Sequence, residues 1–338
     1  MKILFISLGC DKNLADSEEM LGLLTGSGHE IVDSEEDADA IVINTCCFIH
    51  DAKEESVNTI LEMAEYKKTG KCKALIVTGC MAQRYKEEIT QEIPEVDAVL
   101  GTTSYGDIVK ALNEAQAGHV FQEFRDINEL PEDSGRRVLT TGGHFGYLKI
   151  AEGCDKHCTY CIIPSLRGKF RSVPEERLLA QAEYMASQGV KELILVAQET
   201  TVYGTDLYGK KTLHILLKKL CQIKGIRWIR VLYCYPEEIY DELIQVMKEE
   251  KKICNYLDLP IQHASDRILK RMGRRTTQAE LVEIVNKLRR EIPDIVLRTT
   301  LISGFPGETQ EDHEELMSFV DEMEFDRLGV FTYSPEEN

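Results

Sequence analysis

Apolar positions in the amino-terminal part of the chain gather into short runs that alternate with helical patterns. Three runs are rich in Ile, Val and Leu, as in strands buried on both faces of a parallel sheet: KILFISLGC (2–10), AIVINTC (40–46) and ALIVTGC (74–80). Between them, residues 17–29 and 55–70 place apolar side chains at helical spacing and end near glycines. This βαβ alternation predicts an open parallel α/β sheet domain over residues 1–125.

The rest of the chain repeats the strand-then-helix pattern more regularly. Six strand candidates follow a polar, turn-rich linker (126–143): HFGYLKIAE (144–152), ELILVAQ (192–198), WIRVLYCYP (228–236), NYLDLPIQ (255–262), IVLRTTLISG (295–304) and LGVFTYS (328–334). Helical patterns at 174–189, 212–223, 239–251 and 276–292 lie between them, and Thr277 with Glu280 forms a capping box in the last. Six β/α units are fewer than the eight of a TIM barrel, so residues 144–338 are predicted to form a partial (β/α)6 barrel.

Composition narrows the class of protein. The chain has 338 residues and a formal net charge of −18, which argues against a protein that holds nucleic acid mainly through phosphate contacts. An acidic surface suits a basic partner, although a solvated charged surface is the simpler interpretation. No run approaches the roughly 18 apolar residues of a membrane helix, so we expect a cytoplasmic protein without membrane contact. Eleven cysteines in such a protein indicate metal binding or catalysis rather than disulfides.

The segment GCDKHCTYC (153–161) carries three of these cysteines, Cys154, Cys158 and Cys161. His157 is poorly placed to be the fourth ligand of a zinc site, because it directly precedes Cys158, and no second cysteine pair follows. Three thiolates instead suit a [4Fe–4S] cluster with one iron left open for a small molecule. Three buried structural cysteines are the alternative.

The spacing C-x3-C-x2-C, with Tyr160 before the last cysteine, resembles that of the radical S-adenosylmethionine (SAM) enzymes, as does a six-unit barrel that carries it after its first strand. The resemblance implies that the three cysteines hold a [4Fe–4S] cluster and that SAM binds the open iron. SAM is then cleaved to methionine and a 5′-deoxyadenosyl radical. Tyr160 is expected near the adenine.

Residues at other strand ends of the barrel are the candidates for further SAM contacts. AQETTVYG (197–204) and SGFPGE (303–308) are similar to family segments that lie against SAM, although a Pro-Gly turn alone would explain the second. Arg298 lies inside a buried strand and is expected to have a carboxylate partner, such as that of SAM. His263 is more simply a structural histidine. The predicted cofactor contacts are Tyr160, Gln198, Glu199, Gln262, Arg298, Ser303 and Gly304.

Cys10, Cys46 and Cys80 share a pattern in the amino-terminal domain, because each ends one of the three buried strands. Parallel strand ends open into one crevice, so the three thiols are expected to meet there. A second [4Fe–4S] cluster is the functional interpretation and buried structural thiols are the alternative. The remaining cysteines share no pattern and are expected to be structural: Cys47, Cys72, Cys221, Cys234 and Cys254.

Three cysteines upstream of a radical-SAM core resemble the methylthiotransferase family over essentially the whole chain. SLGCDKNLADSE (7–18), NTCCFI (44–49) with AKEES after it, and CIIPSLRG (161–168) are most similar to the branch that modifies an aspartate of a ribosomal protein. Asp11 and Cys47 depart from residues common in that branch. The chain also stops at FTYSPEEN, where members usually continue into a small carboxyl-terminal β-barrel, so we expect it to be truncated or weakened in substrate binding.

The resemblance implies transfer of a methylthio group to the β-carbon of an aspartate in the twelfth small-subunit ribosomal protein. Sulfur is carried on the amino-terminal cluster, and a flavodoxin- or ferredoxin-like donor supplies electrons. Two alternatives stay open. One is a methylthiotransferase that acts on a tRNA adenosine, and the other is a non-catalytic iron–sulfur or zinc protein.

Overall fold

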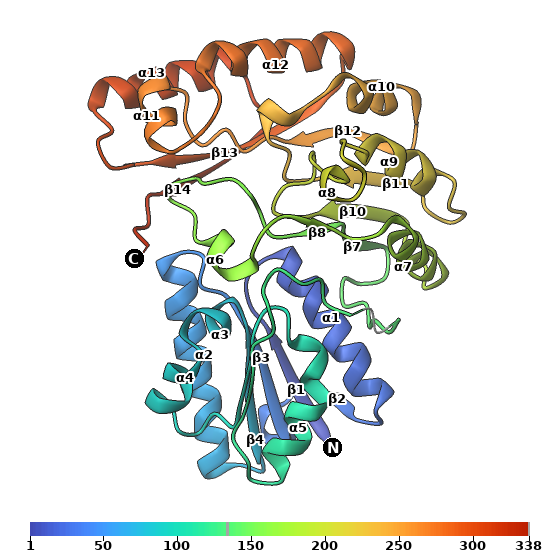
Figure 1. The fold of residues 1–338 in the computed structure, drawn as a ribbon, viewed down its shortest axis with the longest axis vertical. Helices are drawn as coiled ribbons and strands as arrows, with labels where there is room; N and C mark the ends of the chain where they lie inside the picture. The colour runs from blue at the N-terminus through green and yellow to red at the C-terminus, as the bar shows by residue number, and fades with distance from the viewer. Residues whose placement is uncertain (133–134, 337–338) are drawn as a thin grey trace. The chain divides into compact units, whose positions relative to one another are not determined.

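The computed structural model describes residues 1–132 and 135–336, which form two compact units (Figure 1). The first unit contains residues 1–140, the segment 162–171 and Glu336, and the second contains residues 141–161 and 172–335. The first unit is therefore built from separate stretches of sequence. Most of the predicted linker, 126–143, lies in this unit, where Val138 N donates a hydrogen bond to Glu18 O at 3.0 Å.

The first unit has one six-stranded sheet in the order β2-β1-β3-β4-β5-β6, with every neighbouring pair parallel. Its strands are β1 (Lys2–Ser7), β2 (Glu30–Val32), β3 (Ala40–Thr45), β4 (Ala74–Gly79), β5 (Ala98–Leu100) and β6 (Phe121–Glu123). Every residue of β3 and β4 is buried, as their unbroken apolar runs predict. The predicted parallel α/β sheet is confirmed.

Helices cover both faces of this sheet, α2, α3 and α4 on one side and α1 and α5 on the other (Figure 1). Alternate side chains supply two cores: Ile41 and Ile43 face the α2 side, and Ala40 and Val42 face the α1 side. The helices are α1 (Asp11–Gly26), α2 (His50–Thr69), α3 (Cys80–Tyr85), α4 (Glu87–Glu92), α5 (Ile108–Gln116) and α6 (Ile163–Arg167), with 3₁₀ turns η1 (Glu35–Asp37) and η2 (Tyr105–Asp107).

The second unit has a sheet of six parallel strands in the order β14-β13-β12-β11-β10-β7. They are β7 (Phe145–Lys149), β10 (Glu192–Val196), β11 (Trp228–Val231), β12 (Ile253–Asp258), β13 (Val296–Ser303) and β14 (Arg327–Thr332), and two short strands, β8 (Ala151–Glu152) and β9 (Arg171–Ser172), lie outside this sheet. Since β7 and β14 are the two edges, the sheet does not close. The predicted partial (β/α)6 barrel is confirmed, strand for strand.

The second unit contains the four predicted helices and three that were not predicted, at residues 205–208, 266–271 and 310–323. They are α7 (Glu175–Ser187), α8 (Thr205–Tyr208), α9 (Leu213–Cys221), α10 (Asp241–Glu249), α11 (Asp266–Arg271), α12 (Gln278–Glu291) and α13 (Gln310–Met323), with the turn η3 (Pro236–Glu238). The capping box of Thr277 and Glu280 opens α12. A second one opens α13, where Asp312 replaces the usual glutamate. Among the described helices, none combines the length and the apolar character needed to cross a membrane.

Candidate metal centres

The three strand-end cysteines of the first unit come from neighbouring strands. Cys10 follows β1 and precedes the first residue of α1, Cys46 follows β3, and Cys80 follows β4 as the first residue of α3. Because β1, β3 and β4 are adjacent and parallel, their carboxyl ends lie side by side. Cys46 and Cys80 are buried and Cys10 is exposed.

Close backbone packing holds these turns together. Gly9 has φ +90°, and a Cβ added there would lie 2.8 Å from Cys46 Cβ. Gly79 has φ +94°, and a Cβ there would lie 2.5 Å from Thr45 O. Glycine is therefore required directly before both Cys10 and Cys80. Ser56 of α2 fixes the third turn, because its hydroxyl accepts a hydrogen bond from Cys46 N at 3.1 Å and donates one to Cys46 O at 2.8 Å.

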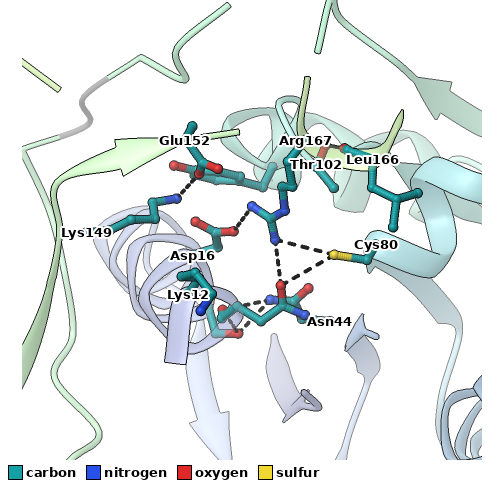
Figure 2. A network of polar contacts seen from close by, with 12 residues as sticks. Lys12, Asp16, Asn44, Cys80, Thr102, Lys149, Glu152, Leu166 and Arg167 are labelled. Carbon is teal, nitrogen blue, oxygen red and sulfur yellow. Dashed lines mark hydrogen bonds and ion pairs between the residues drawn. The ribbon is translucent and has the colours of Figure 1, made fainter. Parts of the chain in front are cut away.

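Side chains of α1 and α6 complete the site (Figure 2). Asn13 Nδ2 donates hydrogen bonds to Leu8 O at 3.2 Å and Thr45 O at 2.9 Å. Arg167 donates from Nη1 to Asp16 at 2.8 Å and from Nη2 to Asn13 Oδ1 at 2.5 Å, and its Nη2 lies 3.6 Å from Cys80 Sγ. These residues lie within the motifs quoted above, but no sequence pattern indicated their contacts.

Two of the three thiols have a raised pKa and are therefore protonated at neutral pH. Burial, with smaller contributions from the neighbouring thiols Cys80 and Cys10, raises the pKa of Cys46 to about 11. Burial also raises the pKa of Cys80, which Arg167 opposes. Coordination replaces the proton of a thiol and neutralises the charge of the thiolate, so neighbouring buried thiols fit a cationic metal centre. Cys47 belongs to the apolar core beside α2, and the same core also includes Cys80. The structural role expected for Cys47 therefore stays a prediction.

The second cysteine set lies in the loop after β8 in the second unit. Cys154 and Cys158 are buried and Cys161 is partly buried. The loop is held by Thr159 N, which donates to Met272 O at 3.0 Å, and by Gly273, where a Cβ would lie 2.7 Å from His157 O. Burial raises the pKa of the Cys154 thiol to about 11.

Neither set gathers its ligands around a single point. Within 1–132 and 135–336 there is no group of three or more His, Cys, Asp or Glu side chains arranged around one metal ion. A [4Fe–4S] cluster does not need such a group, because each thiolate binds a different iron. The donor sets therefore fit clusters in their chemistry, and the six-cysteine assignment stays a prediction.

A buried cation, Arg274, lies close to the second set. Arg274 is 6% exposed, and its guanidinium lies 4.3 Å from the ring centre of Tyr235. Tyr235 OH lies 3.9 Å from Cys158 Sγ. Arg274 Nη2 donates to Pro260 O at 3.1 Å, while Nε and Nη1 have no hydrogen-bond partner among the described residues. Unpartnered buried donors beside a predicted cluster ligand fit an anionic group at this site. No sequence pattern indicated this arginine.

The predicted SAM contacts that follow β10 are Gln198, which is partly buried, and Glu199, which is buried. Gln198 Oε1 has no hydrogen-bond partner among the described residues, and Glu199 is 2% exposed. Burial raises the pKa of Glu199 to about 7, against the opposing charge of Lys156, whose Nζ lies 3.9 Å away. Tyr160 packs against the apolar cluster of Ile268, Met272, Ile302 and Phe305. The unpartnered amide oxygen of Gln198 and the carboxyl group of Glu199, whose pKa lies near neutrality, suit a polar ligand such as SAM.

Of the remaining predicted contacts, Gln262, Ser303 and Gly304 lie at or after the carboxyl ends of β12 and β13, whereas Arg298 is the third residue of β13. Gln262 adopts φ +72°, and Ser303 is the last residue of β13. Gly304 N donates to Glu308 Oε2 at 2.6 Å, so Glu308 shapes the turn that follows β13. Arg298 has the expected carboxylate partner, but it lies within the chain, because Nη1 donates to Asp258 Oδ1 at 2.6 Å. Contact of these residues with SAM stays a prediction.

Two family models match the chain. The model described as "Uncharacterized protein family UPF0004" matches residues 2–101, and that of the Radical SAM superfamily matches residues 148–320. A ribosomal protein uS12 methylthiotransferase RimO of Lachnoclostridium phytofermentans is 68% identical over 338 residues, all of this chain and 77% of that protein. The protein of the same name from Clostridioides difficile is 52% identical over all of this chain and 76% of its own length.

The chain belongs to the uS12 methylthiotransferase (RimO) family. This membership makes it a radical-SAM methylthiotransferase, with SAM and [4Fe–4S] clusters as cofactors. A solved structure of the radical SAM methyltransferase TsrM from Kitasatospora setae, with cobalamin and a [4Fe–4S] cluster bound, shares the fold with a TM-score of 0.70 at 13% identity, over 99% of this chain and 73% of that one. The predicted family, fold class and cofactors are confirmed.

Proposed function

We propose that this chain attaches a methylthio group to the β-carbon of an aspartate in ribosomal protein uS12. The similar proteins from Lachnoclostridium phytofermentans and Clostridioides difficile are named as uS12 methylthiotransferases, which supports this substrate. The observation that carries the proposal is the presence of two three-cysteine sets, one in each unit: Cys10, Cys46 and Cys80, and Cys154, Cys158 and Cys161. The set in the second unit accounts for radical formation, and the set in the first unit accounts for carrying sulfur.

The residues of the second unit have distinct tasks in this proposal. When bound, the cluster and SAM supply the 5′-deoxyadenosyl radical that activates an inert C–H bond. Gln198 and Glu199 bind polar groups of SAM, since both offer buried oxygen acceptors at the end of β10. Tyr160 provides an apolar surface for the adenine. Lys156 and Arg274 stabilise negative charge close to Cys154 and Cys158.

We also propose the partners of the reaction. A basic ribosomal protein is complementary to a chain of net charge −18. A flavodoxin- or ferredoxin-like protein supplies electrons to the clusters, and the reaction takes place in the cytoplasm, where ribosomal proteins are assembled.

The test is anaerobic incubation with SAM and a reductant, using either purified uS12 or tRNA as substrate. We expect uS12 to gain the mass of one methylthio group in place of one hydrogen, on a single aspartate. Modified tRNA beside unmodified uS12 would overturn the proposed substrate. The same reaction should release 5′-deoxyadenosine, and a chain that cleaves no SAM would be a non-catalytic iron–sulfur or zinc protein.

Iron and sulfide counting tests the two cysteine sets. We expect the variant with Cys10, Cys46 and Cys80 changed to alanine to lose half of the iron and to retain SAM cleavage. The variant with Cys154, Cys158 and Cys161 changed to alanine should lose half of the iron and all SAM cleavage. Full iron content in the first variant would show that these cysteines hold no cluster.

A further inference from the structure

Arg167 is a buried cation that lies directly against one of the proposed cluster ligands. It is 3% exposed, and its Nη2 lies 3.6 Å from Cys80 Sγ (Figure 2). The residue ends α6, in the segment 162–171 that belongs to the first unit. Thr102 holds this segment in place, because its hydroxyl donates to Leu166 O at 2.8 Å. Arg167 is therefore an integral part of the first unit's cysteine site.

The contacts of the guanidinium exceed those of a simple ion pair. Nη1 already meets Asp16 at 2.8 Å, and both side chains are buried. Nη2 carries two N–H groups, which can serve Asn13 Oδ1 at 2.5 Å and the Cys80 sulfur together. Removing an arginine from water is costly, and Asp16 alone would compensate its charge. Nη2 therefore lies within reach of the metal ligand as well as of Asn13.

We propose that Arg167 is a positioning residue for the amino-terminal iron–sulfur cluster, which donates a hydrogen bond to the Cys80 sulfur and raises the reduction potential of the cluster. This inference rests on the proposed function of Cys10, Cys46 and Cys80. A [4Fe–4S] core bound by three thiolates is negatively charged and becomes more so on reduction. A buried cation and an N–H···S hydrogen bond stabilise the reduced form more than the oxidised form.

The full chain with Cys154, Cys158 and Cys161 changed to alanine isolates the first cluster. After anaerobic reconstitution with iron and sulfide, a redox titration followed by electron paramagnetic resonance gives its midpoint potential. A hydrogen bond to a charged group contributes enough for roughly a tenfold change in the reduction equilibrium. We thus expect Arg167→Met to lower the midpoint by about 59 mV, the equivalent of tenfold for one electron. Arg167→Lys keeps the charge without the two-pronged geometry and should lie between.

Arg137→Met is the matched control. Arg137 forms a comparable buried ion pair with Glu18 of α1, with Nη2 and Oε2 2.7 Å apart, in the same unit. Arg137 Nε also donates to Glu18 Oε2 at 2.9 Å, so its loss should affect thermal stability and leave the potential unchanged.

An unchanged midpoint in Arg167→Met, with full iron content, would overturn the role of Arg167 and leave the cluster assignment intact. If the chain with Cys154, Cys158 and Cys161 changed to alanine binds no iron even with Arg167 present, both the role of Arg167 and the assignment of the first cluster are overturned. If Arg167→Met fails to retain iron, Arg167→Lys decides: a more negative midpoint supports the proposal, and an unchanged one overturns it.

Discussion

Asn13 is joined to Thr45 by a hydrogen bond of 2.9 Å from its side-chain Nδ2 to the backbone oxygen. The same nitrogen donates to Leu8 O at 3.2 Å. One amide thus ties the turn before Cys10 to the residue before Cys46, and its oxygen accepts from Arg167. This side chain therefore helps, together with Gly9, Gly79 and Ser56, to set the spacing of three thiols that are far apart in sequence.

We expect Asn13→Ala to destabilise the first unit by about 1–3 kcal/mol, because two backbone oxygens lose their donor. The variant should also lose iron from the first cluster, measured with Cys154, Cys158 and Cys161 changed to alanine. Asn255→Ala is the control, since Asn255 bonds Asp294 at 2.8 Å in the other unit. Equal iron content in both variants would contradict the positioning role.

Gly9→Ala should displace Cys46 and weaken the first cluster. Gly9 has φ +90°, and its Cβ would lie 3.1 Å from Cys46 Sγ, whereas Gly28 has φ +84° and open space around it. Both substitutions cost about 1–2 kcal/mol of backbone strain. Only Gly9→Ala adds a clash, so iron content should fall in that variant and stay full in Gly28→Ala. The same iron loss in both would show that strain alone is responsible.

Lys156 holds the second cysteine loop against three carboxylates. Its Nζ lies 3.9 Å from both Glu199 and Glu237, and it also forms a hydrogen bond with Glu238. Lys156→Met leaves these carboxylates without their shared cation, and we expect about 2 kcal/mol of destabilisation. We measure this variant in a chain with Cys10, Cys46 and Cys80 changed to alanine, which leaves only the second cluster. In that chain Lys156→Met should lower both iron retention and SAM cleavage.

Lys211→Met is the control for Lys156. Lys211 also pairs with Glu238, at 2.8 Å, but it lies outside the cysteine loop. The control should keep its iron. If Lys156→Met retains as much iron as Lys211→Met, the lysine does not support the loop.

Glu199 should make stability depend on pH near neutrality. Burial raises its pKa from 4.5 to about 7, so the native state holds a proton that the unfolded chain releases. The resulting stabilisation is complete below the unfolded value and is lost as the pH rises through about 7, by up to about 3 kcal/mol. Chemical unfolding of the cluster-free chain should therefore show a shallower pH dependence for Glu199→Gln. The exposed Glu242→Gln should behave as the unsubstituted chain, and a Glu199 variant with the same slope would contradict the assignment.

The pattern of apolar residues along the sequence was sufficient to predict the longer strands of both sheets. The buried strands β1, β3 and β4 and the six strands of the second sheet all appear as apolar runs. The thiol set of Cys10, Cys46 and Cys80 was predictable because parallel strand ends converge. Strands β2, β5 and β6 have three residues each, too few for a periodic signal.

Contacts between distant residues could not be predicted. Arg167 and Cys80 are 87 positions apart, and no periodicity links them. The start of α1 at Asp11 was missed because its first turns bury polar residues such as Asn13 and Asp16 rather than apolar ones. Arg274 was missed because its stacking on Tyr235 is a contact between distant residues that depends on tertiary structure.

The discontinuous first unit has a consequence for biosynthesis. Its strands and all three of its strand-end thiols leave the ribosome before α6 is made. At about 5–20 residues per second, the 87 positions between Cys80 and Arg167 take roughly ten seconds to translate. During that interval the nascent sheet presents its thiols without their arginine. Cluster insertion that depends on Arg167 would therefore have to wait until the start of the second unit, including Cys161, has been synthesised.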